Sequence, residues 1–237
     1  MAARTHRPRR RTEALSRERI TEAAVELLDT AGESGLTFRA LTERLATGAG
    51  AIYWHVANKG ELLRAATDAV IVTALATPPA GAAPRDRVRA VALGLFDAVE
   101  AHPWVAAQLS ALPYQSTAPR IFESVGQQVK ALGVPEEHWF ATASALVEYI
   151  LGAAGQNAAN TATARALGPA PDRGEILGSV ARAWEGLDAE EYPFTRAVGD
   201  QLRAHDDREQ FLAGIDLILA GVTALHLQDG PRTPREH

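Results

Sequence analysis

Residues 37–59 constrain this chain more than any other segment, because they have the pattern of two short helices joined by a turn of small residues. Thr37 stands where an N-cap hydroxyl accepts from the first free backbone N–H groups of a helix. The apolar side chains that follow share one helical face: Phe38, Leu41 and Leu45. Two helices joined in this way are typical of a helix-turn-helix, whose second helix enters the major groove of DNA. The segment therefore predicts a protein that binds duplex DNA.

The second helix of this pair, expected over residues 49–55, exposes two aromatic side chains. Ile52 and Val56 are four residues apart and take the inward face. Tyr53 and Trp54 then turn to the opposite side, where DNA would lie. The alternative is that both rings belong to the protein core.

The helices on either side have recognisable ends. Ser16 can cap a first helix that Gly32 closes. Asn58 and Glu61 have the spacing of a capping pair for a further helix that begins near Lys59. The Lys59 ammonium is either a solvated surface charge or, at that helix N-terminus, a phosphate contact. These ends predict three short helices followed by a longer connecting one.

Three motifs follow one another in this region: Leu36-Thr37-Phe38-Arg39-Ala40-Leu41, Ala51-Ile52-Tyr53-Trp54-His55-Val56 and Asn58-Lys59-Gly60-Glu61-Leu62-Leu63. Their order and spacing resemble the DNA-binding domain of the tetracycline-repressor (TetR) family of transcriptional regulators. The resemblance runs from about Ser16 to Ala66. It implies that the following residues meet DNA: Thr37, Arg39, Ala49, Gly50, Ala51, Tyr53, Trp54, His55 and Lys59.

The expected recognition helix differs from that of some relatives in its first residues. Ala49, Gly50 and Ala51 stand where other members of the family carry longer polar side chains. Small side chains offer no bidentate hydrogen bonds to base edges, and allow only close approach and contact with thymine methyl groups. The resemblance thus leaves open which bases are read, and how much is read through DNA shape.

Charge is distributed unevenly along the chain. The formal net charge is −5, yet residues 1–64 hold 11 Lys and Arg against 8 Asp and Glu. The basic excess lies near the N-terminus: Arg4, Arg7, Arg9, Arg10 and Arg11. Such a segment cannot build a core, so residues 1–15 are expected to form a flexible basic arm that reaches DNA phosphates or a minor groove. A tail that only adds solubility is the alternative.

Composition limits the class of protein. At 237 residues the chain suits one or two domains. It contains no cysteine, which excludes disulfides and thiolate metal sites and fits a cytoplasmic location. The longest apolar runs are interrupted by Glu148 and Asp216, so no membrane span is expected. The basic N-terminus lacks the apolar stretch of a secretory signal.

The rest of the chain has almost continuous helical periodicity and no convincing strand alternation. After a break at residues 77–84, the first expected helix has the apolar face Val88, Val91, Ala92, Leu95, Phe96 and Val99, and a short helix through Leu112 follows it. Further helices are expected over 119–132, 135–166, 175–187 and 192–205. The last helix is expected to begin at Asp207, which can cap it together with Gln210. The fold class is therefore all-α. A three-helix DNA-binding domain is expected at 16–64, a larger helical domain at 65–229 and a polar tail at 230–237.

Two helices of the larger domain have apolar stripes that suit a helix–helix interface. The stripes contain Leu146 and Ile150 on the long helix and Phe211, Ile215, Ile218, Val222 and Leu225 on the last one. Gly214 and Gly221 would permit close approach on the last helix. Periodicity alone also allows both stripes to lie in the subunit's own core.

The last helix, together with the His-Pro-Trp at 102–104, resembles the C-terminal domain of the tetracycline repressor. This resemblance implies a homodimer with a four-helix interface. A dimer would set two recognition helices about 34–36 Å apart, one DNA turn, on a palindromic operator.

A small-molecule effector is expected to bind between helices of the larger domain and to lower DNA affinity by favouring another arrangement. Aromatic walls and a few polar side chains would hold a largely apolar ligand. The candidate residues are Trp104, Tyr114, Phe122, Gln127, Trp139, Tyr149, Gln156 and Asn157. Ordinary core or surface packing is the alternative for each of them. Tetracycline is not implied, because residues 67–77 lack the histidine that the family's magnesium–tetracycline site uses.

No pattern in the sequence points to a catalytic residue, a metal or a cofactor. The histidines lack metal-ligand spacing, and neither a phosphate-binding loop nor a nucleophile elbow occurs. The sequence therefore favours a ligand-responsive DNA-binding repressor. The alternative is a helical enzyme or interaction scaffold with a vestigial DNA-binding domain. Activation in place of repression, and a protein effector, also stay open.

Overall fold

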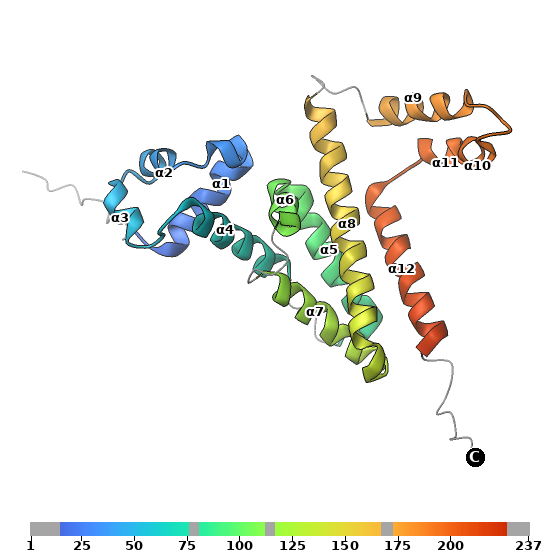
Figure 1. Cartoon of the computed structure of the whole chain (residues 1–237), viewed down its shortest axis with the longest axis horizontal. Coiled ribbons are helices and arrows are strands. Elements are labelled where there is room, and N and C mark those ends of the chain that lie inside the picture. The colour runs from blue at the N-terminus through green and yellow to red at the C-terminus, as the bar shows by residue number, and fades with distance from the viewer. Residues whose placement is uncertain (1–14, 76–80, 112–116, 167–172, 227–237) are drawn as a thin grey trace, which may run out of the picture. The chain divides into compact units, whose positions relative to one another are not determined.

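The computed structural model describes residues 15–75, 81–111, 117–166 and 173–226, and within these ranges it contains helices and no strand (Figure 1). The chain forms two compact units, Met1–Ala66 and Thr67–His237, here called unit 1 and unit 2. The predicted all-α fold, a helix-turn-helix domain followed by a larger helical domain, is confirmed. Except for Leu15, the expected basic arm and polar tail lie outside the described residues. None of the described helices is long and apolar enough to cross a bilayer.

Unit 1 is built from short helices, in chain order α1 (Arg17–Gly35), α2 (Phe38–Leu45), α3 (Ala49–Tyr53) and the beginning of α4 (Lys59–Ala74). The Ser16 hydroxyl accepts a hydrogen bond from the backbone N–H of Arg19 at 3.3 Å. The Thr37 hydroxyl accepts one from the N–H of Ala40 at 3.1 Å. Both predicted N-caps are therefore confirmed, and they fix where α1 and α2 begin.

α1 is interrupted near its end. At Gly32 the backbone has φ 63° and ψ −170°, a conformation that favours glycine because a Cβ would be strained there. The helix then resumes briefly and ends at Gly35. The helix end predicted at Gly32 is thus an interruption within α1.

The turn between α2 and α3 depends on a left-handed residue. Ala46 has φ 49° and ψ 46°, and it is the one non-glycine residue with positive φ in the part of the chain that the structure describes. An L-residue in this conformation brings its Cβ close to the following carbonyl oxygen. The turn therefore carries a local steric cost.

Replacing Ala46 by glycine should raise the free energy of unfolding by about 1 kcal/mol, because glycine adopts this conformation without the Cβ contact. Denaturant unfolding followed by circular dichroism measures the change. Ala65→Gly, within α4, is the matched control and should lower the free energy of unfolding by about 1 kcal/mol. A loss of stability in both variants would show that Ala46 is not strained.

α4 begins at the predicted capping pair. Asn58 Oδ1 accepts from the N–H of Glu61 at 2.9 Å. The Glu61 carboxylate accepts from the N–H of Ala57 at 2.8 Å and from Arg17 Nη2 at 2.8 Å. The predicted capping residues are thus confirmed, and the contact with Arg17 ties α4 to α1 across 44 positions of sequence.

The hydrogen bond from Ala57, with the nearby charge of Arg17, lowers the pKa of Glu61. A carboxyl group whose pKa is lower in the folded state stabilises the fold above its unfolded pKa, and this contribution is lost as the pH falls through the folded value. Glu61→Gln should therefore lower the unfolding temperature at about pH 7 and change it little at about pH 3. Thermal unfolding of both proteins at the two pH values tests this. The exposed Glu22 of α1 supplies the control, since Glu22→Gln changes a surface side chain and should change the unfolding temperature little. An equal loss at both pH values in Glu61→Gln would rule out the carboxylate charge as the cause.

Unit 2 contains the rest of α4 and then α5 (Pro84–Ala101), α6 (Trp104–Ala111), α7 (Thr117–Ala131), the short 3-10 helix η1 (Glu136–His138), α8 (Trp139–Ala166), α9 (Arg173–Glu185), α10 (Pro193–Ala197), α11 (Gly199–Arg203) and α12 (Asp207–His226). The helices predicted over 119–132, 135–166 and 175–187 correspond to α7, to η1 with α8, and to α9. The single helix predicted over 192–205 is instead two short helices, which meet at Val198.

α8 lies at the centre of unit 2, and α5, α6, α7 and α12 pack against it (Figure 1). The apolar face predicted for α5 is buried throughout: Val88, Val91, Ala92, Leu95, Phe96 and Val99. Opposite charges tie the ends of α5 to α12, because Arg89 Nη2 meets Asp216 Oδ2 at 2.6 Å and Arg208 pairs with Asp97. The two helices therefore run antiparallel, with α8 beside both of them.

The stripes predicted at a dimer interface contribute to this core. Most of their residues are buried inside the subunit, with at most 8% of their surface exposed: Leu146, Ile150, Phe211, Ile215 and Val222. Ile218 is half-buried and Leu225 is 74% exposed. A side chain buried in its own subunit has no surface left for a partner. For these five residues the burial supports the alternative, a place in the subunit core.

α12 has a different cap from the one predicted. Asp206 Oδ1 accepts from the N–H of Glu209 at 2.8 Å, so Asp206 is the capping residue. Asp207 instead lies between His205 Nε2, at 2.8 Å, and Arg173 Nη2, at 2.6 Å. The predicted cap is wrong by one residue, because two adjacent aspartates fit the same local pattern and only the folded chain selects between them.

Gly214 lets α12 approach α8 closely. A Cβ at this position would lie 1.9 Å from the hydroxyl oxygen of Tyr149. Tyr149 uses the space, since its hydroxyl donates to the carbonyl oxygen of Phe211 at 3.1 Å. Burial raises the pKa of Tyr149. At Gly221, by contrast, a Cβ would meet no described atom within 4 Å.

Candidate functional site

α3 is held in unit 1 by two side chains and leaves its other residues at the surface. Ile52 is fully buried and Val56 is 1% exposed, which confirms their predicted inward orientation. Ala49 and Gly50 are exposed, and Ala51 is half-buried. The first turn of α3 therefore presents backbone and small side chains, a surface that can approach the floor of a DNA groove closely.

The aromatic pair lies on the outer side of unit 1. Tyr53 is 53% exposed and Trp54 is 90% exposed, so the alternative in which both rings are buried does not hold. Tyr53 stacks on Phe38 of α2 with ring centroids 4.4 Å apart, which fixes the position of its ring. α3 ends at Tyr53, so Trp54 and the half-buried His55 follow it, whereas the predicted helix includes both.

Two further candidate contacts lie at the start of α2. Thr37 is exposed, and its hydroxyl already caps α2. The Arg39 side chain is 88% exposed, and its Nε donates to Glu43 Oε1 at 2.9 Å. Exposed ion pairs of this kind contribute little stability, so an approaching phosphate can replace the carboxylate as the partner of Arg39.

Lys59 makes a structural contact that its sequence position did not indicate. Its side chain is half-buried, and Nζ donates to the backbone carbonyl of Glu33 at 2.6 Å, across 26 positions of sequence. The bond ties the start of α4 to the end of α1. An ammonium group has three donors, so this bond leaves Lys59 able to contact a phosphate as well.

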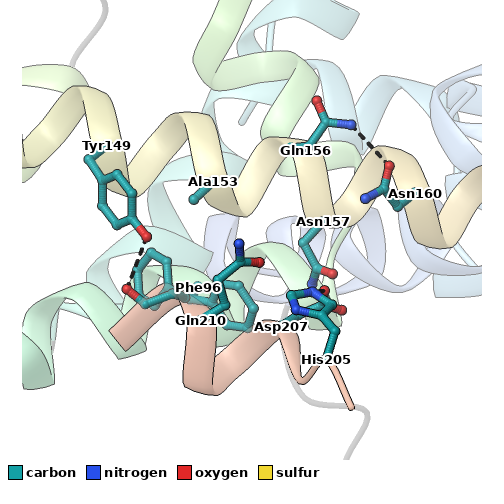
Figure 2. Close-up of a pocket in the computed structure, with 10 residues that line it drawn as sticks. Phe96, Tyr149, Ala153, Gln156, Asn157, Asn160, His205, Asp207 and Gln210 are labelled. Carbon is teal, nitrogen blue, oxygen red and sulfur yellow. Dashed lines mark hydrogen bonds and ion pairs between the residues drawn. The ribbon is translucent and has the colours of Figure 1, made fainter. Parts of the chain in front are cut away.

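A second candidate site is a pocket in unit 2, between α5, α8 and the start of α12 (Figure 2). Its volume is about 270 Å³. Among the predicted ligand-binding residues, the structure brings Tyr149, Gln156 and Asn157 together here. Of the other predicted residues, those that the structure describes do not line it.

These other residues pack locally, which is the alternative left open for each of them. Their contacts are Trp139 with Val134 and Lys130, Phe122 with Phe140, Gln127 with Glu123, and Trp104 with His102. Tyr114 lies outside the described residues. The sequence therefore predicted part of the α8 side of the pocket and missed the opposite side.

The missed lining residues come from elsewhere in the chain. They include Phe96 of α5, His205 in the link before α12, and Asp207, Gln210 and Phe211 of α12. Phe96 and Phe211 lie on the apolar faces of their helices, so helical periodicity predicts only that they are core residues. The pair His205 and Asp207, two residues apart, is the one local signal that could have indicated a polar cluster.

Comparison with known families gives two matches. Residues 20–66 match the family described as "Bacterial regulatory proteins, tetR family". Residues 77–226 match the family described as "Tetracyclin repressor-like, C-terminal domain". The first match contains α2 and α3, and the second contains the whole pocket in unit 2.

Many solved structures are similar to this chain, and three of them bear on its function. The transcriptional regulator SCO7222, a TetR from Streptomyces coelicolor, is 65% identical, with a TM-score of 0.82 over 90% of this chain and 100% of that one. BioQ, solved with its double-stranded DNA operator, is 26% identical, with a TM-score of 0.60 over 89% and 99% of the two chains. ActR from Streptomyces coelicolor, solved in complex with actinorhodin, is 20% identical, with a TM-score of 0.73 over 91% and 99%, and so shares the fold.

Matches to curated proteins are shorter. The chain is 34% identical over 139 residues to an HTH-type transcriptional regulator from Saccharopolyspora erythraea. This match spans 58% of the chain and 59% of that regulator.

Proposed function

Because the chain belongs to the TetR family of bacterial regulatory proteins, we propose that it is a homodimeric repressor that binds a palindromic DNA operator through α3 and leaves it when a small molecule occupies unit 2. The observation that carries the proposal is the exposed pair Tyr53 and Trp54, at the end of a helix that the buried Ile52 anchors. Adjacent exposed aromatic side chains form an apolar patch, and patches of this kind mark interaction sites more often than single exposed rings do.

The surroundings of this pair suit a DNA backbone. Arg39 is exposed on α2, and Lys59 stands at the N-terminus of α4, where helix N–H groups and an ammonium both favour an anion. We propose that Arg39 and Lys59 contact phosphates and set the register of α3, and that Ala49, Gly50 and Ala51 let it sit deep in the groove. Sequence would then be read through methyl contacts and groove shape.

The proposed dimer uses the outer face of α12. Leu217 and Leu225 are 75% and 74% exposed, and the small residues Ala213 and Ala220 are exposed on the same helix. Leu217 follows Ala213 by four positions and precedes Ala220 by three, so the three share one face. A second copy of this helix, packed on that face, would cover apolar surface that water otherwise meets. The dimer supplies the two recognition helices that a palindrome needs.

The effector acts by linkage in this proposal. The molecule binds unit 2 more tightly in a subunit arrangement that does not fit DNA. It therefore lowers the affinity of the protein for DNA, and DNA lowers the affinity of the protein for the molecule by the same factor. ActR, which has the same fold, was solved with actinorhodin bound, and this supports a ligand-binding role for the C-terminal domain. We also propose a regulator without catalytic activity, located in the cytoplasm with its operator.

The test is a gel-shift titration with the duplex that flanks the coding sequence of the chain, at low and at high salt. Binding should resist unrelated competitor DNA and should weaken as the salt concentration rises, because the protein neutralises phosphates. In sedimentation, the complex should contain two subunits on one palindrome. Failure to shift any flanking duplex at low salt would favour the alternative function, a helical enzyme or scaffold with a vestigial DNA-binding domain.

A further inference from the structure

Asn157 is a largely buried residue whose amide has no hydrogen-bond partner in the part of the chain that the structure describes. It is 8% exposed. Figure 2 shows the amide on α8, pointing across the pocket toward His205 and Asp207. The neighbouring amides Gln156 and Asn160 are bonded to each other at 2.9 Å. Asn157 lines the pocket, so its amide, which is not bonded to the protein, is available to a ligand that enters the cavity.

The opposite end of the pocket is an aromatic wall formed by Phe96, Tyr149 and Phe211. The ring centroids of Phe96 and Phe211 are 4.7 Å apart, and those of Tyr149 and Phe211 are 5.8 Å apart. The hydrogen bond from the Tyr149 hydroxyl to the Phe211 carbonyl holds the wall together. A rigid wall of rings suits the face or edge of another ring.

The pocket offers no free charge to a ligand. Asp207 is the one carboxylate among the described lining residues, which include neither Lys nor Arg. Its two oxygens are already paired, with Arg173 at 2.6 Å and with His205 at 2.8 Å. A charged ligand would therefore lose hydration without gaining an unpaired opposite charge.

We propose that this pocket binds a neutral ring compound that carries a carboxamide-like edge, the ring packing on the aromatic wall and the edge pairing with the Asn157 amide. An amide side chain offers one acceptor and two donors, so it is complementary to a ligand that has a carbonyl and an N–H or O–H side by side. Gln210, exposed on α12 at the rim, offers a second amide. The volume of about 270 Å³ lies just below the usual range for small-molecule sites, which limits the ligand to about two fused rings.

This assignment names the effector class of the proposed regulator, but it concerns ligand binding alone. The test uses the full-length protein without DNA and three probes that share one ring system: naphthalene-2-carboxamide, 2-naphthoate and 2-naphthylmethylammonium. Isothermal titration calorimetry measures their affinities. The carboxamide should bind at least about tenfold more tightly than either ion. Equal or tighter binding of an ion, or no carboxamide binding at about 1 mM, would overturn the assignment.

Asn157→Leu tests the amide directly, because leucine has a similar size and no hydrogen-bonding group. The variant should bind the carboxamide at least about tenfold more weakly, and its unfolding temperature should change little, since the Asn157 amide makes no hydrogen bond with the described residues. The matched control is Gln127→Leu, an exposed amide of α7 outside the pocket, which should bind like the parent. If Asn157→Leu fails to fold, Gln210→Leu at the rim replaces it, with a loss of affinity expected. Unchanged affinity in the folded variant would refute the role of the amide.

The two proposals fail in different ways. If the protein binds the carboxamide through Asn157 but never binds flanking DNA, the pocket assignment stands and the proposed function is wrong. If the protein binds operator DNA but binds no probe, the proposed function stands and the pocket assignment is wrong.

Discussion

Replacing Trp54 by alanine should weaken binding to the operator at least about tenfold and leave the unfolding temperature almost unchanged. The indole is 90% exposed, so its removal takes little packing from the fold, and surface substitutions of this kind usually change stability by less than about 0.5 kcal/mol. In a DNA complex the same ring would be covered, and truncated tryptophans at interface centres are among the costliest losses. Fluorescence anisotropy with labelled flanking duplex measures the affinity, and thermal unfolding measures stability.

The control for Trp54 is another highly exposed ring, in unit 2. Phe194 of α10 is 77% exposed, so Phe194→Ala removes a similar apolar surface without touching unit 1. Operator affinity should be unchanged in that variant. If Trp54→Ala binds the operator as tightly as the parent, the ring does not meet DNA, and the helix-turn-helix must approach the duplex in another orientation.

Local periodicity predicted where the helices of unit 1 begin, because these helices carry their own start signals. The caps at Ser16 and Thr37 follow from hydroxyl residues just before apolar faces, and both are present. The inward pair Ile52 and Val56 follows from a spacing of four, and its burial leaves Tyr53 on the outer side. Such signals operate within one or two helical turns, the range over which side chains on one helix are neighbours.

Contacts between distant parts of the chain could not be predicted in this way. The bond from Lys59 to the Glu33 carbonyl depends on where α1 breaks, at Gly32, and on how α4 then returns beside it. The pocket has the same character, since Asn157 and His205 come from α8 and from the link before α12. Neither residue stands out in its own segment, and only tertiary packing brings the two side chains to one pocket.

The stripes on α8 and α12 show what periodicity leaves undecided. Repeating apolar residues show that one face of a helix is covered, whereas the identity of the covering element is set by the whole fold. Ile150 and Ile215 are fully buried inside the subunit, while Leu217, two positions after Ile215, is 75% exposed. The inner stripe therefore belongs to the core, and the outer residues of α12 are those available to a second copy.

Replacing Gly94 by alanine should lower the free energy of unfolding of unit 2 by about 1–3 kcal/mol, the usual cost of overpacking. A Cβ on Gly94 of α5 would lie 2.2 Å from the backbone carbonyl oxygen of Ala74, at the end of α4. Backbone cannot rotate away as a side chain can, so α4 and α5 must separate. Because α4 is one continuous helix that begins in unit 1, we expect the variant also to bind its operator with altered affinity. Denaturant unfolding and amide hydrogen exchange in α5 measure the effect on unit 2.

The control for Gly94 isolates the steric contact from the helix preference of alanine. Gly126 lies inside α7, and a Cβ there would meet no described atom within 4 Å. Gly126→Ala should therefore raise the free energy of unfolding by about 0.5–1 kcal/mol, because alanine is the better helix former. The two variants make the same chemical change on two helices of one unit. Opposite signs of the change in the free energy of unfolding would therefore report the close approach of α5 to α4. If both variants are stabilised, α4 and α5 do not pack through Gly94, and the end of α4 is free to move without strain in α5.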